Sequence, residues 1–250
     1  MASSLKPSYC IIENETDEMV REIGVDEAGR GPMLGRVYTA AVILSPHQTV
    51  FDHTLMKDSK KFHSEKKIRE AAAYIKANAI AWSIAYASER EIDDLNIRRA
   101  THHAMHKAIK GVIGGANAVG GANAVGANAS TISKPLPLNP ANTFLLLIDG
   151  NDFTPCIIQQ EAEAQPFRLS HVCIEGGDNT YSCIAAASIL AKVARDDYIA
   201  ELCKANPILD THYGLLKNKG YGTKIHMDGI KEHGISPYHR KTFGICRNFA

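Results

Sequence analysis

Short apolar runs and amphipathic stretches alternate along this chain, with polar segments between them. Five runs rich in β-branched, aromatic and small residues predict strands, at 21–29, 36–44, 79–88, 142–152 and 167–178. The run at 142–152 is almost continuously apolar until it reaches Asp149. Such a run is typical of a central strand that is covered on both faces.

Four segments have the spacing or composition of helices, at 64–78, 88–114, 180–206 and 223–234. Ser64 is a candidate N-cap, Pro207 ends the third segment and Gly234 closes the fourth. The polar stretches at 51–63 and 212–223 are predicted as loops, and 236–244 as a tail. Because strands and helices intermix, the pattern predicts an α/β fold, with a mixed central sheet, helices on both faces and a C-terminal helical segment.

A near-repeat of Gly-Ala-Asn-Ala-Val occupies residues 114–130, and the proline-containing stretch KPLPLNP follows it. So short a repeat cannot build a solenoid, and its composition is typical of an exposed flexible insertion. The strand after the repeat is needed by the sheet. We therefore expect one domain over residues 1–250, with a low-complexity insertion at about 114–140.

Composition and charge mainly exclude certain classes of protein and site. The chain has 250 residues and a formal net charge of +1, so it can bury a sizeable core, and any nucleic-acid surface must come from local clustering. None of the six cysteines forms a CxxC pair, which argues against a zinc ribbon and favours small buried hydrophobes in a reducing compartment. The sequence shows neither a signal-peptide pattern nor a membrane-spanning apolar run. We expect a cytoplasmic monomer that does not contact membranes.

Three of the apolar runs end in acidic residues: Asp26 and Glu27 in the first, Asp149 in the fourth and Asp178 in the fifth. An acid at the end of a buried strand is costly unless it is paired, solvated or bound to a cation. Three such ends in one sheet predict convergence at a common edge, with oxygen ligands that suit Mg²⁺. Two such ions can activate water and stabilise a leaving oxygen in phosphodiester cleavage. The alternative is that these acids are strand-end caps or turn formers.

The sequence Gly29-Arg30-Gly31 follows the first two acids and is not a dinucleotide-binding loop. Pro32 interrupts the spacing, and a predicted strand follows where that fingerprint needs a helix. Backbone amides and an arginine beside a cation site instead suit a sugar-phosphate backbone. Because side chains alternate along a strand, the two adjacent acids before the turn should point to opposite faces, so that one faces the metal site less directly.

Six stretches together resemble the ribonuclease HII family, the type 2 ribonucleases H, in that family's order. They are GVDEAGRGP at 24–32, DSKK at 58–61, IDGN at 148–151, AAASILAKVARD at 185–196, NKGYGTKIH at 218–226 and HRKTF at 239–243. The Gly-Ala-Asn repeat lies outside the pattern. The resemblance implies an RNase H-like fold, and metal-dependent cleavage of RNA in RNA–DNA hybrids and at single ribonucleotides in duplex DNA. It also implies 5′-phosphate and 3′-hydroxyl ends.

The resemblance further implies roles for single residues. Four acids of the family hold two Mg²⁺ or Mn²⁺ ions, and they match Asp26, Glu27, Asp149 and Asp178. Asp178 fits through its Gly-Asp pair; its rival is Asp196, which we interpret as a structural residue, a partner of Arg195. The residues that read the 2′-hydroxyl at an RNA–DNA junction match Gly29, Arg30, Gly31 and Tyr221. Backbone-phosphate contacts match Lys60, Ser188 and Lys192.

Several alternatives stand beside this interpretation. Ribonuclease HIII typically carries an extra N-terminal substrate-binding domain, and only residues 1–20 precede the first predicted strand. The eukaryotic catalytic subunit works in a three-chain complex, whereas NKGYGT and the short end after HRKTF look more like the single-chain bacterial form. A catalytically silent hybrid-binding module finds no support, because all four acids are present. A magnesium-dependent phosphatase would have no use for the Gly-Arg-Gly turn.

Overall fold

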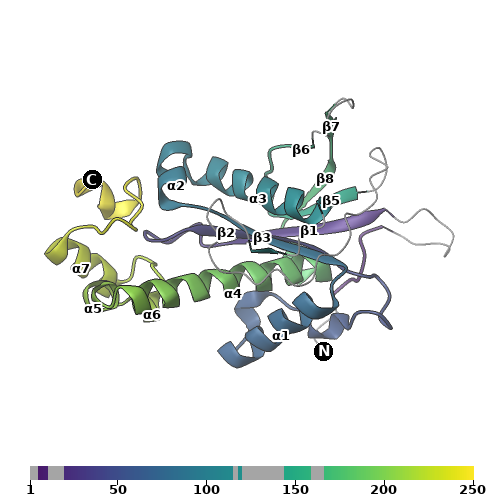
Figure 1. Cartoon of the computed structure of the whole chain (residues 1–250), viewed down its shortest axis with the longest axis horizontal. Helices are drawn as coiled ribbons and strands as arrows, with labels where there is room; N and C mark the ends of the chain where they lie inside the picture. Colours follow the sequence, from purple (N-terminus) through teal and green to yellow (C-terminus); the bar gives the residue numbers. More distant parts are fainter. Residues whose placement is uncertain (1–4, 11–19, 115–117, 120–143, 159–165) are drawn as a thin grey trace.

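The computed structural model describes residues 5–10, 20–114, 118–119, 144–158 and 166–250, and within these ranges a mixed sheet of six strands forms the centre of the protein (Figure 1). Its strand order is β4–β3–β2–β1–β5–β8, and a separate two-stranded sheet pairs β6 with β7. The strands are β1 (Arg21–Ala28), β2 (Val37–Ile43), β3 (Ala81–Ala87), β4 (Ala118–Val119), β5 (Phe144–Asp149), β6 (Ile157–Ile158), β7 (Phe167–Arg168) and β8 (Ser170–Ile174). The predicted insertion at about 114–140 lies almost entirely outside the described residues.

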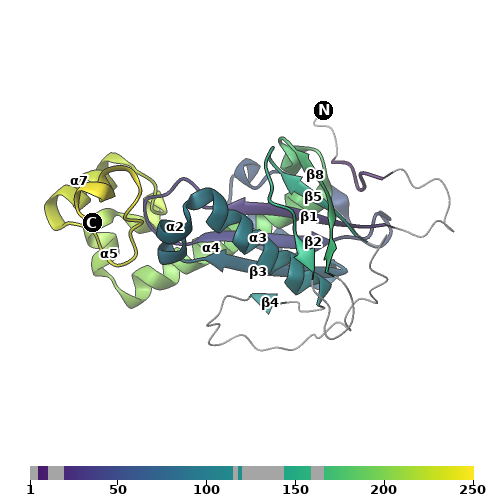
Figure 2. The ribbon, with the colours of Figure 1, turned by 90° about the horizontal axis from the view of Figure 1, so that it is seen from above.

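Helices cover both faces of the sheet, which confirms the predicted arrangement (Figures 1 and 2). On one face lie α1 (Glu65–Asn78) and α4 (Ser182–Ala205), packed in a shared apolar cluster. On the other lie α2 (Glu89–Leu95) and α3 (Ile97–Ile113). Two short 3-10 turns, at 53–55 and 59–61, interrupt the loop that leads into α1.

The register of the central strands brings their acidic ends together. β1 runs antiparallel to β2 and parallel to β5, and β5 runs parallel to β8. Val25 lies beside Ile148, and Asp149 lies beside Ile174. The ends of three neighbouring strands therefore meet at one edge of the sheet.

A glycine below α4 lets this helix lie close to β1. A Cβ atom on Gly24 would lie 2.2 Å from the carbonyl carbon of Cys183, so no side chain fits there. The neighbouring Ile23 and Val25 point to the opposite face and pack in the apolar cluster of α3. Gly24 thus allows α4 to pack close to β1, and this close packing brings the polar residues of α4 to the edge of the sheet.

We expect the Gly24→Ala substitution to lower the free energy of unfolding by about 3 kcal/mol, because the added methyl group meets helix backbone that cannot rotate away. Gly222→Ala is the matched control, since its Cβ would lie 3.4 Å from the Met33 side chain, an ordinary contact. That control should change stability by less than about 1 kcal/mol. Urea unfolding of the two variants measures the difference, and equal stabilities would contradict this account of the helix–strand contact.

The long helical segment predicted at 88–114 is wrong in one respect, because it breaks into α2 and α3 at Asn96. This residue has φ 66°, in the left-handed region, and ends the first helix. Its side chain then accepts a hydrogen bond from the Arg99 amide (3.1 Å) and caps the second helix. Asparagine tolerates both the positive φ and the capping role. Because the apolar spacing continues on both sides of Asn96, that spacing does not show the break.

The C-terminal helical segment is confirmed, and it contains more structure than the sequence predicts. It consists of α5 (Ile208–Tyr213), α6 (Leu215–Asn218), α7 (Lys224–His233) and a final 3-10 turn (Gly244–Asn248), around an apolar cluster of its own. The predicted loop at 212–223 is therefore partly helical. The predicted tail at 236–244 contains no helix or strand before Gly244, but it is packed into the protein, because His239 and Arg240 are 2% and 0% exposed. Polar residues that are buried by hydrogen bonds leave no apolar pattern from which burial can be predicted.

The described cysteines are free thiols, buried at Cys156, Cys183, Cys203 and Cys246 and half-buried at Cys10 and Cys173. The prediction of small buried hydrophobes is thus confirmed for four of them. No helix among the described residues combines the length and the apolar character needed to cross a membrane. The single-domain organisation, the monomeric state and the cytoplasmic location stay predictions.

Candidate active site

Three acidic side chains from three elements come together at the edge of the sheet. Asp26 belongs to β1, Asp149 ends β5, and Asp178 lies in the 3-10 turn Gly177–Asn179. Each offers a carboxylate oxygen, and these oxygens lie within 4.8 Å of one another. Asp26 and Asp178 are each only 4% exposed. The sheet thus brings together three of the four predicted acids as one cluster.

The chain reaches this arrangement through the turn after β8. Gly176 has φ 64°, which reverses the chain, and the Gly177 amide donates a hydrogen bond of 2.7 Å to Oδ1 of Asp149. The Asn179 side chain donates to Oδ1 of Asp178 (3.0 Å). Since Gly176 permits the backbone conformation and Asp149 accepts the amide, Asp178 is held against the end of β5.

The electrostatics of the three acids fit a divalent cation. Burial, followed by the charges of Glu27 and Asp149, raises the pKa of Asp26 well above its usual value, against a lowering hydrogen bond from Ser188. Burial and the charge of Asp149 likewise raise the pKa of Asp178. Buried carboxylates at this separation repel one another unless a proton or a cation neutralises them. An all-oxygen donor set suits hard ions such as Mg²⁺ and Mn²⁺.

Glu27 lies beside the cluster without joining it. Its amide donates to Oδ1 of Asp26 (2.6 Å), while its carboxylate forms an ion pair with Arg30 (3.3 Å). Its side chain is 16% exposed and faces the same cavity. This separation agrees with the alternation along β1 expected from the sequence.

Asp196 faces the same cavity but lies outside the three-acid cluster. Its carboxylate forms an ion pair of 2.6 Å with Lys192, one helical turn earlier on α4. Burial lowers the pKa of Arg195 and the charge of Asp196 opposes that shift, so the predicted partnership exists through charge, while the ion pair itself is made with Lys192. The geometry favours Asp178 over Asp196 as a partner of Asp26 and Asp149.

Basic and hydroxyl side chains lie next to the acids in the same cavity. Burial lowers the pKa of Lys60, but the negative charges of Asp178 and Asp58 outweigh it, and the net shift is upward. Ser188 shares a hydrogen bond of 3.0 Å with Ser59, which fixes α4 against the DSKK motif. These side chains place positive charge and hydroxyl groups next to the acids, as a phosphate-binding wall requires.

The turn at 29–31 lies against Tyr221, and both Gly29 and Tyr221 line the cavity. Gly29 has φ 93°, and a Cβ there would lie 2.1 Å from Nε of Arg195, so the turn rests on this buried arginine. A Cβ on Gly31 would lie 3.4 Å from the Tyr221 ring. The side chains of Arg30 and Tyr221 remain about half exposed, so a ligand can reach both of them.

This cavity has a volume of about 350 Å³. The predicted residues that line it are Asp26, Glu27, Gly29, Lys60, Asp149, Ser188, Lys192 and Tyr221. Asp178, Arg30 and Gly31 lie outside that lining. The other lining residues were not predicted as site residues, although all except Lys217 belong to motifs singled out in the sequence; they are Ala28, Ser59, Arg195, Asp196, Lys217, Asn218 and Lys219.

Comparison with protein families gives one match over most of the chain. The family model described as "Ribonuclease HII" matches residues 23–119 and 116–246. A curated relative with that description, from Porphyromonas gingivalis, is 40% identical over 93% of this chain and 94% of its own length.

Two solved structures share the fold at low sequence identity. The ribonuclease H2 of Pyrococcus horikoshii OT3 has a TM-score of 0.60 at 18% identity, and the match covers 92% of this chain and 97% of that one. The Bst ribonuclease HIII, solved in complex with Mn²⁺, also has a TM-score of 0.60, at 16% identity, over 91% of this chain and 68% of that one. These likenesses confirm the predicted RNase H-like fold.

Proposed function

This chain belongs to the ribonuclease HII family, and from that premise we propose that it nicks duplex DNA on the 5′ side of a single ribonucleotide and cleaves the RNA strand of RNA–DNA hybrids. As a member of the family it is a hydrolase of the ribonuclease H type. The observation that carries the finer proposal is the three-acid cluster of Asp26, Asp149 and Asp178 beside the turn at 29–31. A metal site next to an exposed, glycine-framed arginine suits a sugar-phosphate backbone.

Asp26, Asp149 and Asp178 would hold one divalent ion, and Glu27 would complete the carboxylates for a second. When bound, such ions neutralise phosphate charge, activate water and stabilise the leaving oxygen, which gives 5′-phosphate and 3′-hydroxyl ends. The Mn²⁺ bound by the Bst ribonuclease HIII supports Mg²⁺ or Mn²⁺ as the ion. The four acids would bind these ions and orient them against the substrate phosphate.

The remaining predicted residues would recognise the nucleic acid. Lys60 and Lys192 would meet the backbone phosphates with Ser188, and binding should weaken as salt rises. Arg30 and Tyr221, with the amides of the turn, would meet the 2′-hydroxyl, the group that distinguishes RNA from DNA. The packing of Gly31 against the Tyr221 ring supports this, because it places the turn and the ring side by side.

The test is incubation of the purified protein with a DNA duplex that carries one ribonucleotide, in Mg²⁺, in Mn²⁺ and in EDTA. We expect a metal-dependent nick on the 5′ side of the ribonucleotide. Cleavage of longer RNA–DNA hybrids alone would retain the metal site but remove the 2′-hydroxyl roles. Cleavage of neither, together with hydrolysis of a phosphomonoester, would replace the proposal by a phosphatase activity.

A further inference from the structure

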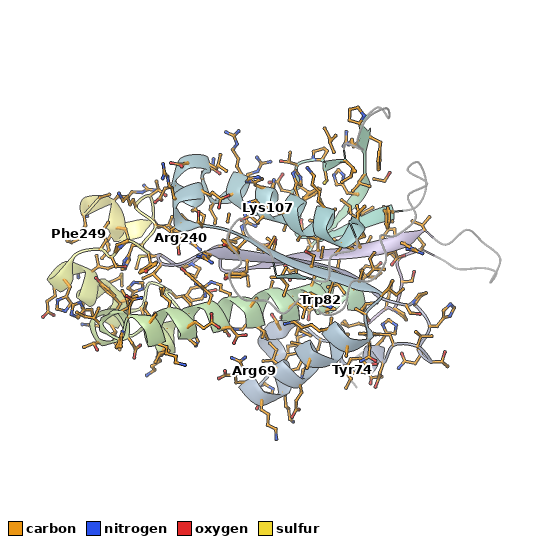
Figure 3. The ribbon with its side chains drawn as sticks, viewed as in Figure 1. Arg69, Tyr74, Trp82, Lys107, Arg240 and Phe249 are labelled. Carbon is orange, nitrogen blue, oxygen red and sulfur yellow. The ribbon has the colours of Figure 1, made fainter. Side chains whose placement is uncertain are left out.

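Arg240 is a buried cation that holds the turn at 29–31 by its backbone. Its side chain is fully buried where the C-terminal helical segment meets the end of the sheet (Figure 3). Its guanidinium donates to three carbonyls, those of Gly29 (2.6 Å), Arg30 (2.9 Å) and Gly35 (2.7 Å). In the described part of the chain no carboxylate forms an ion pair with it.

Burying this charge costs free energy. Burial, and after it the charge of Arg195, lower the pKa of Arg240 to about 9, so the side chain remains charged at neutral pH. The charges of Glu89 and Asp93 oppose this lowering, but neither carboxylate forms an ion pair with Arg240, so its burial carries a desolvation cost that no direct ion pair offsets. Its bonds all go to the turn and its flank, which indicates a role at the site.

The adjacent residue, His239, holds the backbone of Tyr221 through a second histidine, His226. The Ser236 amide donates to Nδ1 of His239 (2.9 Å), so the proton of this neutral ring lies on Nε2. His226 Nδ1 lies 3.0 Å from the carbonyl oxygen of Tyr221, which can only accept, so His226 carries its proton on Nδ1.

The two tautomers agree with the bond between the rings. Nε2 of His239 lies 3.0 Å from Nε2 of His226, and the proton on His239 fits the free lone pair of His226. Burial lowers the pKa of both rings, that of His239 to about 4, which keeps them neutral. A directional chain of hydrogen bonds therefore runs from Ser236 through both histidines to the Tyr221 backbone.

We propose that His239 and Arg240 form one positioning unit that fixes the gap between the turn at 29–31 and Tyr221, and so sets the preference for a ribonucleotide. This inference rests on the proposed function. Neither side chain contacts substrate; Arg240 holds the turn by its carbonyls, and His239 holds the Tyr221 backbone through His226. Misplacement of a reacting group by about 1 Å can lower a rate by about 100-fold. Loss of the hydrogen bonds of either Arg240 or His239 should therefore lower the rate of cleavage.

Four variants test the unit on two substrates, a duplex with one ribonucleotide and an RNA–DNA hybrid. His239→Asn keeps an acceptor for the Ser236 amide but loses the donor to His226. The longer side chain of His239→Gln can place its amide nitrogen where Nε2 lies, so it retains a donor to His226. Arg240→Lys retains the charge but loses the fork that reaches three carbonyls. The control is Arg247→Lys in the same segment, since among the described residues the Arg247 side chain donates to the Thr242 carbonyl (2.5 Å) and not to the turn at 29–31.

We expect His239→Asn and Arg240→Lys to lower kcat on the single-ribonucleotide duplex by about 10- to 100-fold, with KM changed by less than about threefold and a smaller loss on the hybrid. His239→Gln should recover most of the loss, and Arg247→Lys should match the wild type. Equal losses on both substrates, or equal Asn and Gln variants, would overturn the positioning role. A wild-type protein that cleaves neither substrate would instead overturn the proposed function, and the inference with it.

A measurement on the wild-type protein keeps the test decisive if a variant fails to fold. Nitrogen NMR of the histidine rings at pH 7 should show His226 protonated on Nδ1 and His239 on Nε2. The opposite tautomers, or a charged imidazolium at either ring, would remove the hydrogen-bond chain on which the inference depends.

Discussion

The Asp149→Asn variant should lose at least about 1,000-fold in metal-dependent turnover, measured on a duplex with one ribonucleotide and on an RNA–DNA hybrid. Asp149 is the centre of the acid cluster, since it ends β5 between the strand of Asp26 and the turn of Asp178. An amide oxygen carries no net charge, so a cation shared with the other acids would lose several kcal/mol of attraction.

The same variant should keep the fold. Oδ1 of Asp149 accepts the Gly177 amide (2.7 Å), and the amide oxygen of asparagine can accept that bond in the same place. Removing one of three close negative charges also relieves repulsion. In EDTA we therefore expect the thermal unfolding midpoint of Asp149→Asn to be equal to or above that of the wild type, and Mn²⁺ to raise only the wild-type midpoint.

Asp196→Asn is the matched control, because Asp196 lines the same cavity but is already paired with Lys192. It should retain turnover within about tenfold of the wild type, because an ion pair at a half-buried position contributes little. Turnover of Asp149→Asn within that same range would remove Asp149 from the catalytic site. A large loss in Asp196→Asn alone would restore Asp196 as the fourth acid.

The sequence predicts the parts of this fold in which apolar residues recur in a regular pattern along the chain. Apolar runs predict the strands β1, β2, β3 and β5, and the residues that end them predict where the acids gather, because parallel neighbours end at the same edge. The alanine-rich pattern predicts α4, whose close approach to β1 depends on Gly24. These features need only the local period and the type of residue.

Other parts depend on single contacts that no period reveals. Asn96 breaks a helix whose apolar spacing continues on both sides. Arg240 is held by hydrogen bonds to backbone carbonyls more than 200 residues away, and His239 by a hydrogen bond to the ring of His226, 13 residues away. Their segment therefore resembles an exposed polar tail. Local patterns therefore predict the acidic residues of the site, but not Arg240 and His239, which hold the turn at 29–31 and the Tyr221 backbone.

Tyr221→Ala should relax the preference for a ribonucleotide. The Tyr221 ring is half exposed at the cavity entrance, and its amide is held separately by the Asn218 carbonyl (2.9 Å), so the loop should survive the truncation. Loss of a stacking ring costs about 1–3 kcal/mol, and we expect kcat/KM on the single-ribonucleotide duplex to fall about 30-fold. Cleavage within longer RNA–DNA hybrids should fall less, because further contacts share the binding.

Tyr221→Phe separates the two contributions of this side chain, since it keeps the ring and removes the hydroxyl group. If the hydroxyl reads the 2′-oxygen, the phenylalanine variant loses discrimination between ribonucleotide and deoxyribonucleotide while binding persists. Arg30→Ala is a less direct probe, because it also releases Glu27 from its ion pair. Tyr9→Ala, a comparably exposed tyrosine outside the cavity, is the control. Full discrimination in both Tyr221 variants would show that the gap is set by backbone amides, which would leave Gly29, Arg30 and Gly31 to read the ribonucleotide without the ring.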